Sequence, residues 1–342
     1  MPANLTQQYL KAEDAYRQAT SLEEELRCRQ VMLQEIPKHK GTDHLQAALK
    51  AKIASTRKEI DSERAAGKKS GGLSIKIPRQ GAGTAIIIGG PNAGKSQLLK
   101  SLTKATPEVA IYPYTTKIPQ PGMMPWNDVY VQLIDTPPIT KDYIDPYAYG
   151  LIRAAELAIL MVDLGSDDGV SQAYDVLDKM RLTKTRLGQK TCLDEDDIGI
   201  TYTKAILVFN KMDLPEAAER KEMFWELLPD EFHLNDWDTY DISADRDLGG
   251  ESCNLEPLRD DIYKSMGVIR VYTKLPTKKV ADLDRPFTVK NGDSLLDLAG
   301  QVHKDYSEKL KFARIWGSQV HDGTPVKGDY VLVDGDIVEM HM

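Results

Sequence analysis

The sequence of 342 residues has few cysteines and no long apolar run. Its three cysteines, Cys28, Cys192 and Cys253, lie far apart and lack the spacing of metal ligands, so we expect reduced thiols. No apolar stretch reaches the roughly 18 residues that a membrane-spanning helix needs. The first residues show no apolar core of the kind found in signal peptides. These features predict a cytoplasmic protein that does not insert into a membrane.

Charge is distributed unevenly along the chain, which carries a net charge of -8. Residues 1–80 hold 15 Lys and Arg against 10 Asp and Glu, whereas residues 81–267 hold 18 against 31. Residues 268–342 hold 11 of each kind. Because an acidic surface repels phosphate, we expect any contact with nucleic acid to come from the two ends of the chain. A basic, solvated helix pair would give the same excess, so charge alone identifies no partner.

The first 66 residues are predicted to be helical. Apolar residues recur there at helical intervals, and an interruption by proline and glycine predicts a helical hairpin. Ser21 followed by Glu24 matches a capping box, which would divide the first half of this region in two. Residues 66–72 then have the composition of a linker.

Residues 82–267 alternate between strand and helix patterns. Near-continuous apolar strands are expected at residues 85–88, 129–134, 157–162 and 205–209, and helices near 95–104, 171–186, 216–228 and 254–266. Strands this apolar belong in a sheet that is covered on both faces. The segment therefore predicts a doubly wound α/β domain, whose ligand loops lie at the carboxyl ends of the strands.

The pattern changes at residue 268. Apolar and polar residues alternate over 268–273, which indicates a strand with one buried face. A second strand near 287–289, a helix over 294–302 and short strands up to residue 340 complete the prediction. Residues 268–342 are thus expected to form a small β-grasp domain.

Residues 89–96 (GGPNAGKS) match the pattern G-x-x-x-x-G-K-[ST] between a predicted strand and a predicted helix. Such a loop wraps closely around phosphates, and its N–H groups and the helix N-terminus point at them. The lysine adds positive charge, and the hydroxyl of the last residue can bind Mg²⁺. We expect the nucleotide to contact Pro91, Asn92, Ala93, Gly94, Lys95, Ser96 and Gln97.

A second motif, Asn-Lys-Met-Asp, follows the predicted strand 205–209. The Asp213 carboxylate can accept hydrogen bonds from N1–H and the exocyclic amine of guanine, which adenine does not offer. Lys211 would lie along the base, and Asn210 would tie the loop to residues 89–96. A further strand is expected to end at Ile242, and a backbone N–H just after it, near Ser243, Ala244 and Asp245, would bind the guanine carbonyl. The two motifs together predict GTP rather than ATP.

Two further residues are candidates for binding Mg²⁺ together with Ser96. Asp135 ends the strand 129–134 and would reach the ion through water. Residues 112–116 (YPYTT) lie between the two motifs, and Thr116 is the better candidate there for a second hydroxyl. A threonine pair in a loop is usually just solvated, so its role rests on comparison with a family.

The motifs GGPNAGKS and YPYTT resemble the Obg superfamily of translation-linked GTPases. Residues 37–45, 269–274, 302–305 and 315–318 are similar to the developmentally regulated GTP-binding (DRG) branch, whose C-terminal module is the TGS domain. The resemblance covers almost the whole chain. It implies a GTPase that acts on or near the ribosome, with a TGS domain that contacts RNA or a protein partner.

The chain departs from that family at two places. DRG proteins carry an extra inserted domain, but residues 137–205 leave room only for one helix–strand–helix passage. The usual D-x-x-G motif is Asp-Thr-Pro-Pro here, so Pro138 stands where glycine is expected. Ile139 follows it in place of a water-orienting glutamine. These features are most similar to a DRG-related protein of prokaryotic type with a modified second switch.

The leading hypothesis is a GTP-hydrolysing switch coupled to ribosome function, with Lys95 and Thr116 in catalysis. Asn92 matches GTPases that recruit K⁺, but a plain turn residue explains it equally well. The alternative is a GTP- or GDP-binding scaffold with little hydrolysis. Pro138 favours the scaffold because proline has no N–H to offer the γ-phosphate. An ATP-driven enzyme is disfavoured by Asp213.

Overall fold

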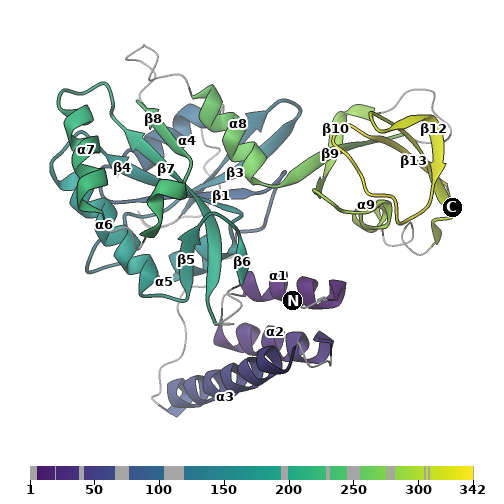
Figure 1. Ribbon diagram of the computed structural model, residues 1–342, viewed down its shortest axis with the longest axis horizontal. Coiled ribbons are helices and arrows are strands. Elements are labelled where there is room, and N and C mark those ends of the chain that lie inside the picture. Colours follow the sequence, from purple (N-terminus) through teal and green to yellow (C-terminus); the bar gives the residue numbers. More distant parts are fainter. Residues whose placement is uncertain are drawn as a thin grey trace, which may run out of the picture.

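The structure is a computed structural model in which three groups of elements are recognisable (Figure 1). It describes residues 6–19, 21–37, 42–65, 77–103, 119–193, 199–228, 232–244, 255–274, 276, 282–303, 306 and 309–341. N-terminal helices lie along one side of a central sheet, and a smaller sheet stands beside it, reached through the extended strand β9. The predicted linker 66–72 lies outside the described residues.

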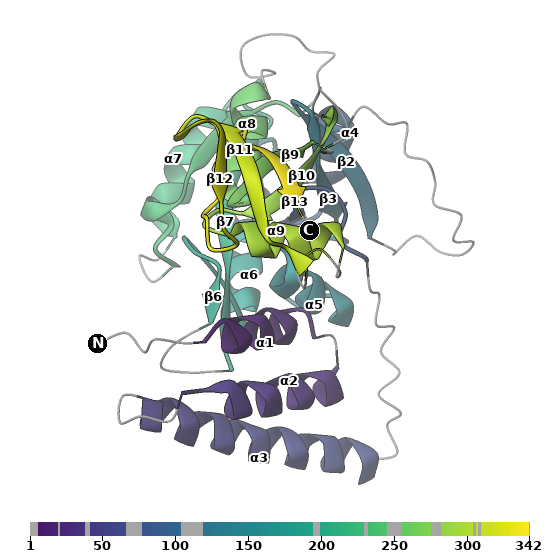
Figure 2. The same ribbon diagram turned by 90° about the vertical axis from the view of Figure 1, so that its right-hand side faces the viewer.

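The N-terminal region contains three helices rather than the two of a hairpin: α1 (Gln7–Arg17), α2 (Leu22–Glu35) and α3 (Asp43–Ala65). Ser21 caps α2 by accepting a hydrogen bond from the Glu24 N–H, as the sequence indicated. The three helices lie in successive layers, with α1 nearest the central sheet (Figure 2). No described helix has both the length and the hydropathy of a membrane span.

The central sheet has the strand order β2-β3-β1-β4-β7-β5, and β6 and β8 also pair with β7. Strands β1, β3, β4, β7 and β8 run parallel, and β2 is antiparallel to β3. The strands are β1 (Thr84–Gly89), β2 (Gln120–Trp126), β3 (Val129–Asp135), β4 (Leu157–Asp163), β5 (Thr185–Gly188), β6 (Cys192–Leu193), β7 (Thr201–Asn210) and β8 (Thr239–Ile242).

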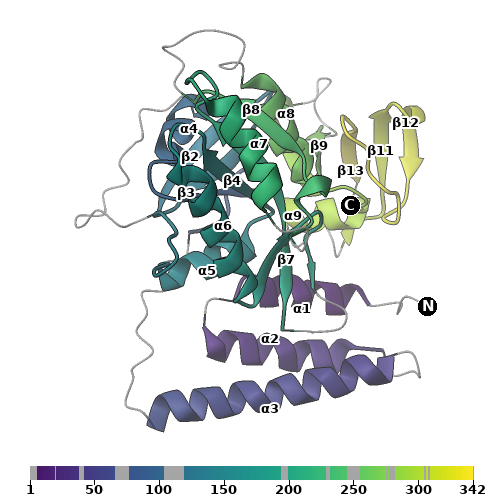
Figure 3. The ribbon, with the colours of Figure 1, turned by 60° about the vertical axis from the view of Figure 1, so that its left-hand side comes forward.

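Helices cover both faces of this sheet, as a doubly wound fold requires. One face packs against α5 (Pro146–Ala154), α6 (Asp168–Arg181) and α7 (Ala217–Leu227), which lie in front of the strands in Figure 3. The other face packs against α4 (Lys95–Leu102) and α8 (Glu256–Ser265). Alternate residues of β1 enter each core: Ile86 and Ile88 face the first, and Ala85 and Ile87 face the second. The predicted α/β class is confirmed.

Three strands were not predicted. β5 and β6 follow α6, so the passage 137–205 is more than one helix, one strand and one helix. β2 contains Pro121, Gly122 and Pro125, which ordinarily argue against a strand. They are tolerated because, among the described strands, β2 lies at the edge of the sheet and pairs with β3 alone.

The C-terminal sheet has the order β10-β9-β13-β11-β12 and packs its core against α9 (Leu295–Val302), which agrees with the predicted β-grasp. Its strands are β9 (Val268–Thr273), β10 (Asp282–Lys290), β11 (Phe312–Gly317), β12 (Val320–Val326) and β13 (Ile337–His341). Ser294 begins α9 with a capping box that it forms with Asp297.

Candidate nucleotide-binding site

The loop between β1 and α4 has the backbone shape that its glycines permit. Gly94 has φ of 90°, and a Cβ there would lie 2.2 Å from the Asn210 Nδ2 atom, so only glycine fits. Asn92 also adopts a left-handed conformation, with φ of 57°, and its side chain is exposed. The loop thus leads directly from a buried strand into the first turn of α4, where backbone N–H groups are free to bind an anion.

Lys95 is buried, and its ammonium donates hydrogen bonds to the carbonyls of Gly89 at 3.2 Å and Gly90 at 2.7 Å. Burial lowers the pKa of Lys95 to about 8, although the charge of Asp135 opposes this shift. The ammonium therefore lies inside the loop, close to where bound phosphates would add a stronger partner.

Ser96 and Asp135 are brought together from α4 and the end of β3. The Ser96 hydroxyl donates to Asp135 Oδ2 at 2.5 Å, and the buried Oδ1 atom has no partner among the described residues. Burial raises the pKa of Asp135, against the hydrogen bond from Ser96 and the charge of Lys95. A hydroxyl and a carboxylate with a free oxygen suit Mg²⁺, which prefers oxygen ligands and keeps several waters. The described residues contain no cluster of three His, Cys, Asp or Glu side chains that would hold a metal alone.

Asn210, at the end of β7, joins two loops through its side-chain amide. Its Nδ2 donates to the Ala93 carbonyl at 2.9 Å, and its Oδ1 accepts from the Ala244 N–H at 2.9 Å. Both bonds are buried. The predicted tie between the Asn-Lys-Met-Asp motif and the phosphate loop is therefore present in the structure.

Asp213 lies on the exposed side of the same loop. Its carboxylate accepts a hydrogen bond from the Ser243 hydroxyl, which in turn accepts from the Asp213 N–H at 3.2 Å. Ser243 follows β8, so the two adjacent parallel strands β7 and β8 deliver these residues to one edge of the sheet. An anchored carboxylate facing solvent can receive the two donors on the edge of guanine.

The segment after Asp135 is held close to the phosphate loop. The Ile139 N–H donates to the Gly89 carbonyl at 3.1 Å, and the Ile139 side chain is buried in the core beneath α5 and α6. Pro138 is exposed. Ile139 therefore does not project toward the phosphate loop as a water-orienting residue would.

Not every predicted residue is part of this described cluster. Thr116 and Asp245 lie outside the described residues. Pro91 is half-buried in the loop, and Gln97 is exposed on the first turn of α4. Lys211 has φ of 67° and forms an ion pair with Asp163, which the sequence analysis missed. A usable signal was present, because Asp163 ends a fully buried strand and β4 pairs with β7.

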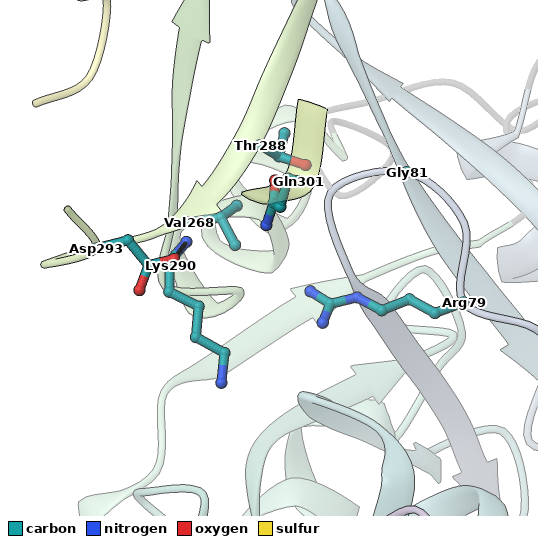
Figure 4. Close-up of a pocket in the computed structure, with 7 residues that line it drawn as sticks. All are labelled: Arg79, Gly81, Val268, Thr288, Lys290, Asp293 and Gln301. Atoms are coloured by element: carbon teal, nitrogen blue, oxygen red, sulfur yellow. Dashed lines mark hydrogen bonds between the residues drawn. The ribbon is translucent and has the colours of Figure 1, made fainter. Parts of the chain in front are cut away.

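A cavity of about 360 Å³ lies elsewhere, between the residues that precede β1 and the C-terminal sheet (Figure 4). Its lining includes Arg79, Lys290 and Asp293. Arg79 forms an ion pair with Glu156, and Lys290 forms one with Asp14. Among the described residues that line this cavity, none is a predicted nucleotide-binding residue. It lies at the amino end of β1, opposite the edge where ligands bind in folds of this class.

Comparison with known proteins identifies two families along the chain. Residues 84–211 match the family model described as 50S ribosome-binding GTPase, and residues 269–342 match the TGS domain. An uncharacterized GTP-binding protein of Methanocaldococcus jannaschii is 28% identical, over 93% of this chain and 92% of its own. Developmentally-regulated G-protein 2 of Arabidopsis thaliana is 25% identical (89% and 87% covered). Ribosome-interacting GTPase 1 of Saccharomyces cerevisiae is also 25% identical (88% and 94%). The predicted resemblance to the DRG branch is confirmed, and the chain combines a GTPase domain with a TGS domain.

Proposed function

We propose that this protein acts in the cytoplasm, binds GTP and GDP with Mg²⁺, and hydrolyses GTP as a switch associated with the ribosome. The observation that supports it most is the pair of buried hydrogen bonds from Asn210, which join the phosphate loop to the guanine motif. A phosphate-binding loop alone would suit many nucleotides. The linked carboxylate of Asp213 is what selects guanine.

The residues then divide the work between binding and charge stabilisation. The loop N–H groups and Lys95 bind the phosphates, and Lys95 exchanges its loop carbonyl partners for phosphate oxygens. Ser96 and Asp135 would hold Mg²⁺, which supplies charge neutralisation at the phosphates when bound. Thr116 is proposed as a further hydroxyl ligand. Because Ile139 is buried, water must be oriented by other groups.

Nucleotide competition tests the guanine assignment. Wild-type protein should prefer GDP over ADP by roughly 10⁴-fold, the range expected where buried polar groups read a base edge. Asp213→Asn should shift preference from guanine toward xanthine nucleotides, because the paired acceptor geometry is lost. Asp236→Asn is a matched control, since this acidic residue is exposed and far from the motif along the chain. Equal affinity of the wild type for ADP and GDP would contradict the proposal.

The ribosomal part is proposed from the name of the yeast relative and from the basic N-terminal segment. Lys50, Arg57 and Lys58 are exposed on α3, where they are available to phosphate. Replacing all three with glutamine should weaken salt-sensitive sedimentation with ribosomes and leave GDP affinity unchanged. The TGS domain would supply a second contact, to RNA or to a protein partner. Wild-type protein that never sediments with ribosomes, whichever nucleotide is bound, would contradict this part.

A second candidate function is a GTP- or GDP-binding scaffold with little hydrolysis. Pro138 favours it, because a proline at this place cannot donate to the γ-phosphate. Single-turnover hydrolysis in K⁺ and then in Na⁺ separates the two. Faster hydrolysis in K⁺ that Asn92→Ala abolishes would support the switch and a K⁺ ligand role for Asn92. Absence of hydrolysis in both salts, even with ribosomes, would support the scaffold.

A further inference from the structure

Asp163 is a buried carboxylate at the edge of the nucleotide site. It is the last residue of β4, and only 4% of its surface is exposed. One carboxylate oxygen, Oδ1, accepts from the Gly165 N–H at 2.7 Å. The other, Oδ2, lies 2.8 Å from the ammonium of Lys211. Burying a charge is costly unless it is paired. The Asp163 carboxylate is therefore stabilised by a specific partner and not by water.

The partner, Lys211, belongs to the guanine motif, and 32% of its side chain is exposed, so part of the stem can contact a bound base. Its backbone lies in the left-handed region, with φ of 67°, directly after the anchored Asn210. A Cβ built on Gly165 would lie 2.6 Å from the Lys211 Cδ atom, so the stem runs flat against the Gly165 backbone. Backbone, stem and ammonium are each held by a different contact, and Asp163 supplies the last of them.

We propose that Asp163 is a positioning residue for the nucleotide base: by binding the ammonium of Lys211, it keeps the Lys211 stem extended along the surface on which the base stacks. This inference rests on the proposed binding of guanine nucleotides. A lysine side chain otherwise loses much rotamer freedom on binding. With Asp163 in place, that loss has already occurred before the nucleotide arrives, which is the usual benefit of preorganisation.

This role differs from that of Asp213 in a measurable way. Asp213 reads the edge of the base, so its replacement alters selectivity between bases. The Lys211 stem covers the face of the base, and every purine has the same kind of face. Loss of Asp163 should therefore lower the affinities for GDP and IDP by the same factor and leave the ratio of the two affinities unchanged.

A double-mutant cycle on the full-length protein provides the test, with dissociation constants for GDP and IDP measured by calorimetry. Asp163→Asn should lower the affinity for each nucleotide roughly tenfold, which lies within the range of interaction energies between contacting residues. Lys211→Met keeps an unbranched stem but removes the ammonium, and should have a similar effect. The double variant should bind no more weakly than Lys211→Met alone. Asp167→Asn is the matched control, because that carboxylate is 92% exposed and pairs with Arg220 instead.

A second variant keeps the test decisive if Asp163→Asn does not fold. Gly165→Ala leaves both charges in place but displaces the Lys211 stem, so it should weaken GDP and IDP equally. Additive effects of Asp163→Asn and Lys211→Met, or a changed ratio of GDP to IDP, would overturn the inference. So would a lowered unfolding midpoint with unchanged GDP affinity. Failure of the wild type to bind GDP would instead overturn the proposed function itself.

Discussion

Asp128, in the turn between β2 and β3, forms an ion pair with Arg270 of β9, with 3.0 Å between Oδ1 and Nη1. The other carboxylate oxygen of Asp128 accepts from the Tyr272 hydroxyl at 2.5 Å. Arg270 also lies over the ring of Trp126, 5.2 Å from its centroid. The C-terminal sheet is thus attached to a hairpin whose second strand, β3, ends in a residue of the candidate Mg²⁺ site. The β2–β3 hairpin thus contacts the C-terminal sheet at its turn and carries Asp135 at the far end of β3.

Asp128→Ala should weaken this junction while leaving the C-terminal sheet intact, because Arg270 keeps its ion pair with Asp334. We expect the free energy of unfolding to fall by about 1–2 kcal/mol, since the lost bonds involve a charged, partly buried acceptor. Urea unfolding of the full-length protein measures it. Asp322→Ala, a change at an exposed position of β12 in the C-terminal sheet, serves as the control.

The pH dependence of that difference follows from the Asp128 carboxylate. Burial opposes its ionisation, but hydrogen bonds from Tyr272 and Arg270 outweigh burial and hold its pKa below the ordinary 3.8. A depressed pKa stabilises the folded state above the ordinary value, and the stabilisation is lost as pH falls through the folded pKa. The difference in unfolding free energy between wild type and Asp128→Ala should therefore be constant from pH 5 to 7 and disappear only below about pH 4. If the difference in unfolding free energy disappeared near neutral pH instead, a group other than Asp128 would be responsible for the pH dependence.

Lys95 predicts proton uptake on nucleotide binding. In the ligand-free protein burial lowers its pKa to about 8, whereas bound phosphates favour the charged form and raise that pKa. GDP binding at pH 8 should thus take up about half a proton, and binding at pH 6.5 almost none. Affinity should fall as pH rises above 8. Calorimetry in buffers of different ionisation enthalpy measures the uptake directly.

The control for this prediction lies on the same helix. Lys100 is exposed in the last turn of α4, and Lys100→Met should keep the full uptake. Equal proton uptake at pH 6.5 and pH 8 would show that a different group titrates.

Glu25 predicts how strongly the N-terminal helices are attached. Its carboxylate lies 2.7 Å from Arg153 of α5 and 3.4 Å from Arg29 of its own helix, and the three side chains are at most 9% exposed. Glu25→Ala leaves two buried guanidinium groups without this partner, which should cost about 3–5 kcal/mol of unfolding free energy. Glu25→Gln retains an acceptor and should cost less.

Thermal and urea unfolding check this prediction, with Glu23→Ala as the control because Glu23 is exposed on the same helix. A loss no larger than the control's would mean that the Glu25 contacts contribute little. Since α5 directly follows the segment of Pro138 and Ile139, GDP and GTP affinities of Glu25→Ala should be measured alongside.

The sequence predicted those parts of the fold where the local residue pattern is compatible with only one kind of element. Continuous apolar runs predicted β1, β3, β4 and β7, because such runs bury both faces of a strand. Each nucleotide-binding motif directly follows one of these strands. Asn210, at the end of β7, therefore lies beside the phosphate loop at the end of β1 and bonds to it. Parallel strands deliver their carboxyl ends to a common edge, so the site followed from the strands.

The features of the fold and site that the sequence did not predict depend on contacts between distant segments of the chain. β2 has the composition of a turn, and only its place at the sheet edge makes it a strand. The Asp163–Lys211 ion pair required knowing that β4 neighbours β7. Asp128 and Arg270 are 142 residues apart, and nothing local to either residue indicates the partner. Tertiary packing, not local preference, determines these features.

Pro138 predicts a slow switch. A glycine at this place would offer its N–H to the γ-phosphate, and proline has no N–H and a fixed φ. The next N–H, that of Ile139, already donates to Gly89, and the Ile139 side chain is fixed in the core. A lost hydrogen bond to a charged oxygen is worth about 1.5–3 kcal/mol, or roughly 10- to 150-fold in the preference of the closed loop for GTP over GDP. We therefore expect similar affinities for GTP and GDP, and weak hydrolysis without a partner.

Pro138→Gly restores the donor but also frees the unfolded backbone, so we expect only part of that factor to return. Hydrolysis rate and GTP-dependent protection of residues 138–150 from protease should both rise in the variant. Pro215→Gly provides the control, because that exposed proline lies beyond the guanine motif and its replacement frees the backbone without adding a donor near the phosphate loop. Rapid, unassisted hydrolysis by the wild type, with residues 138–150 already protected by GTP, would show that another group donates to the γ-phosphate. The missing N–H of Pro138 would then have no effect on switching.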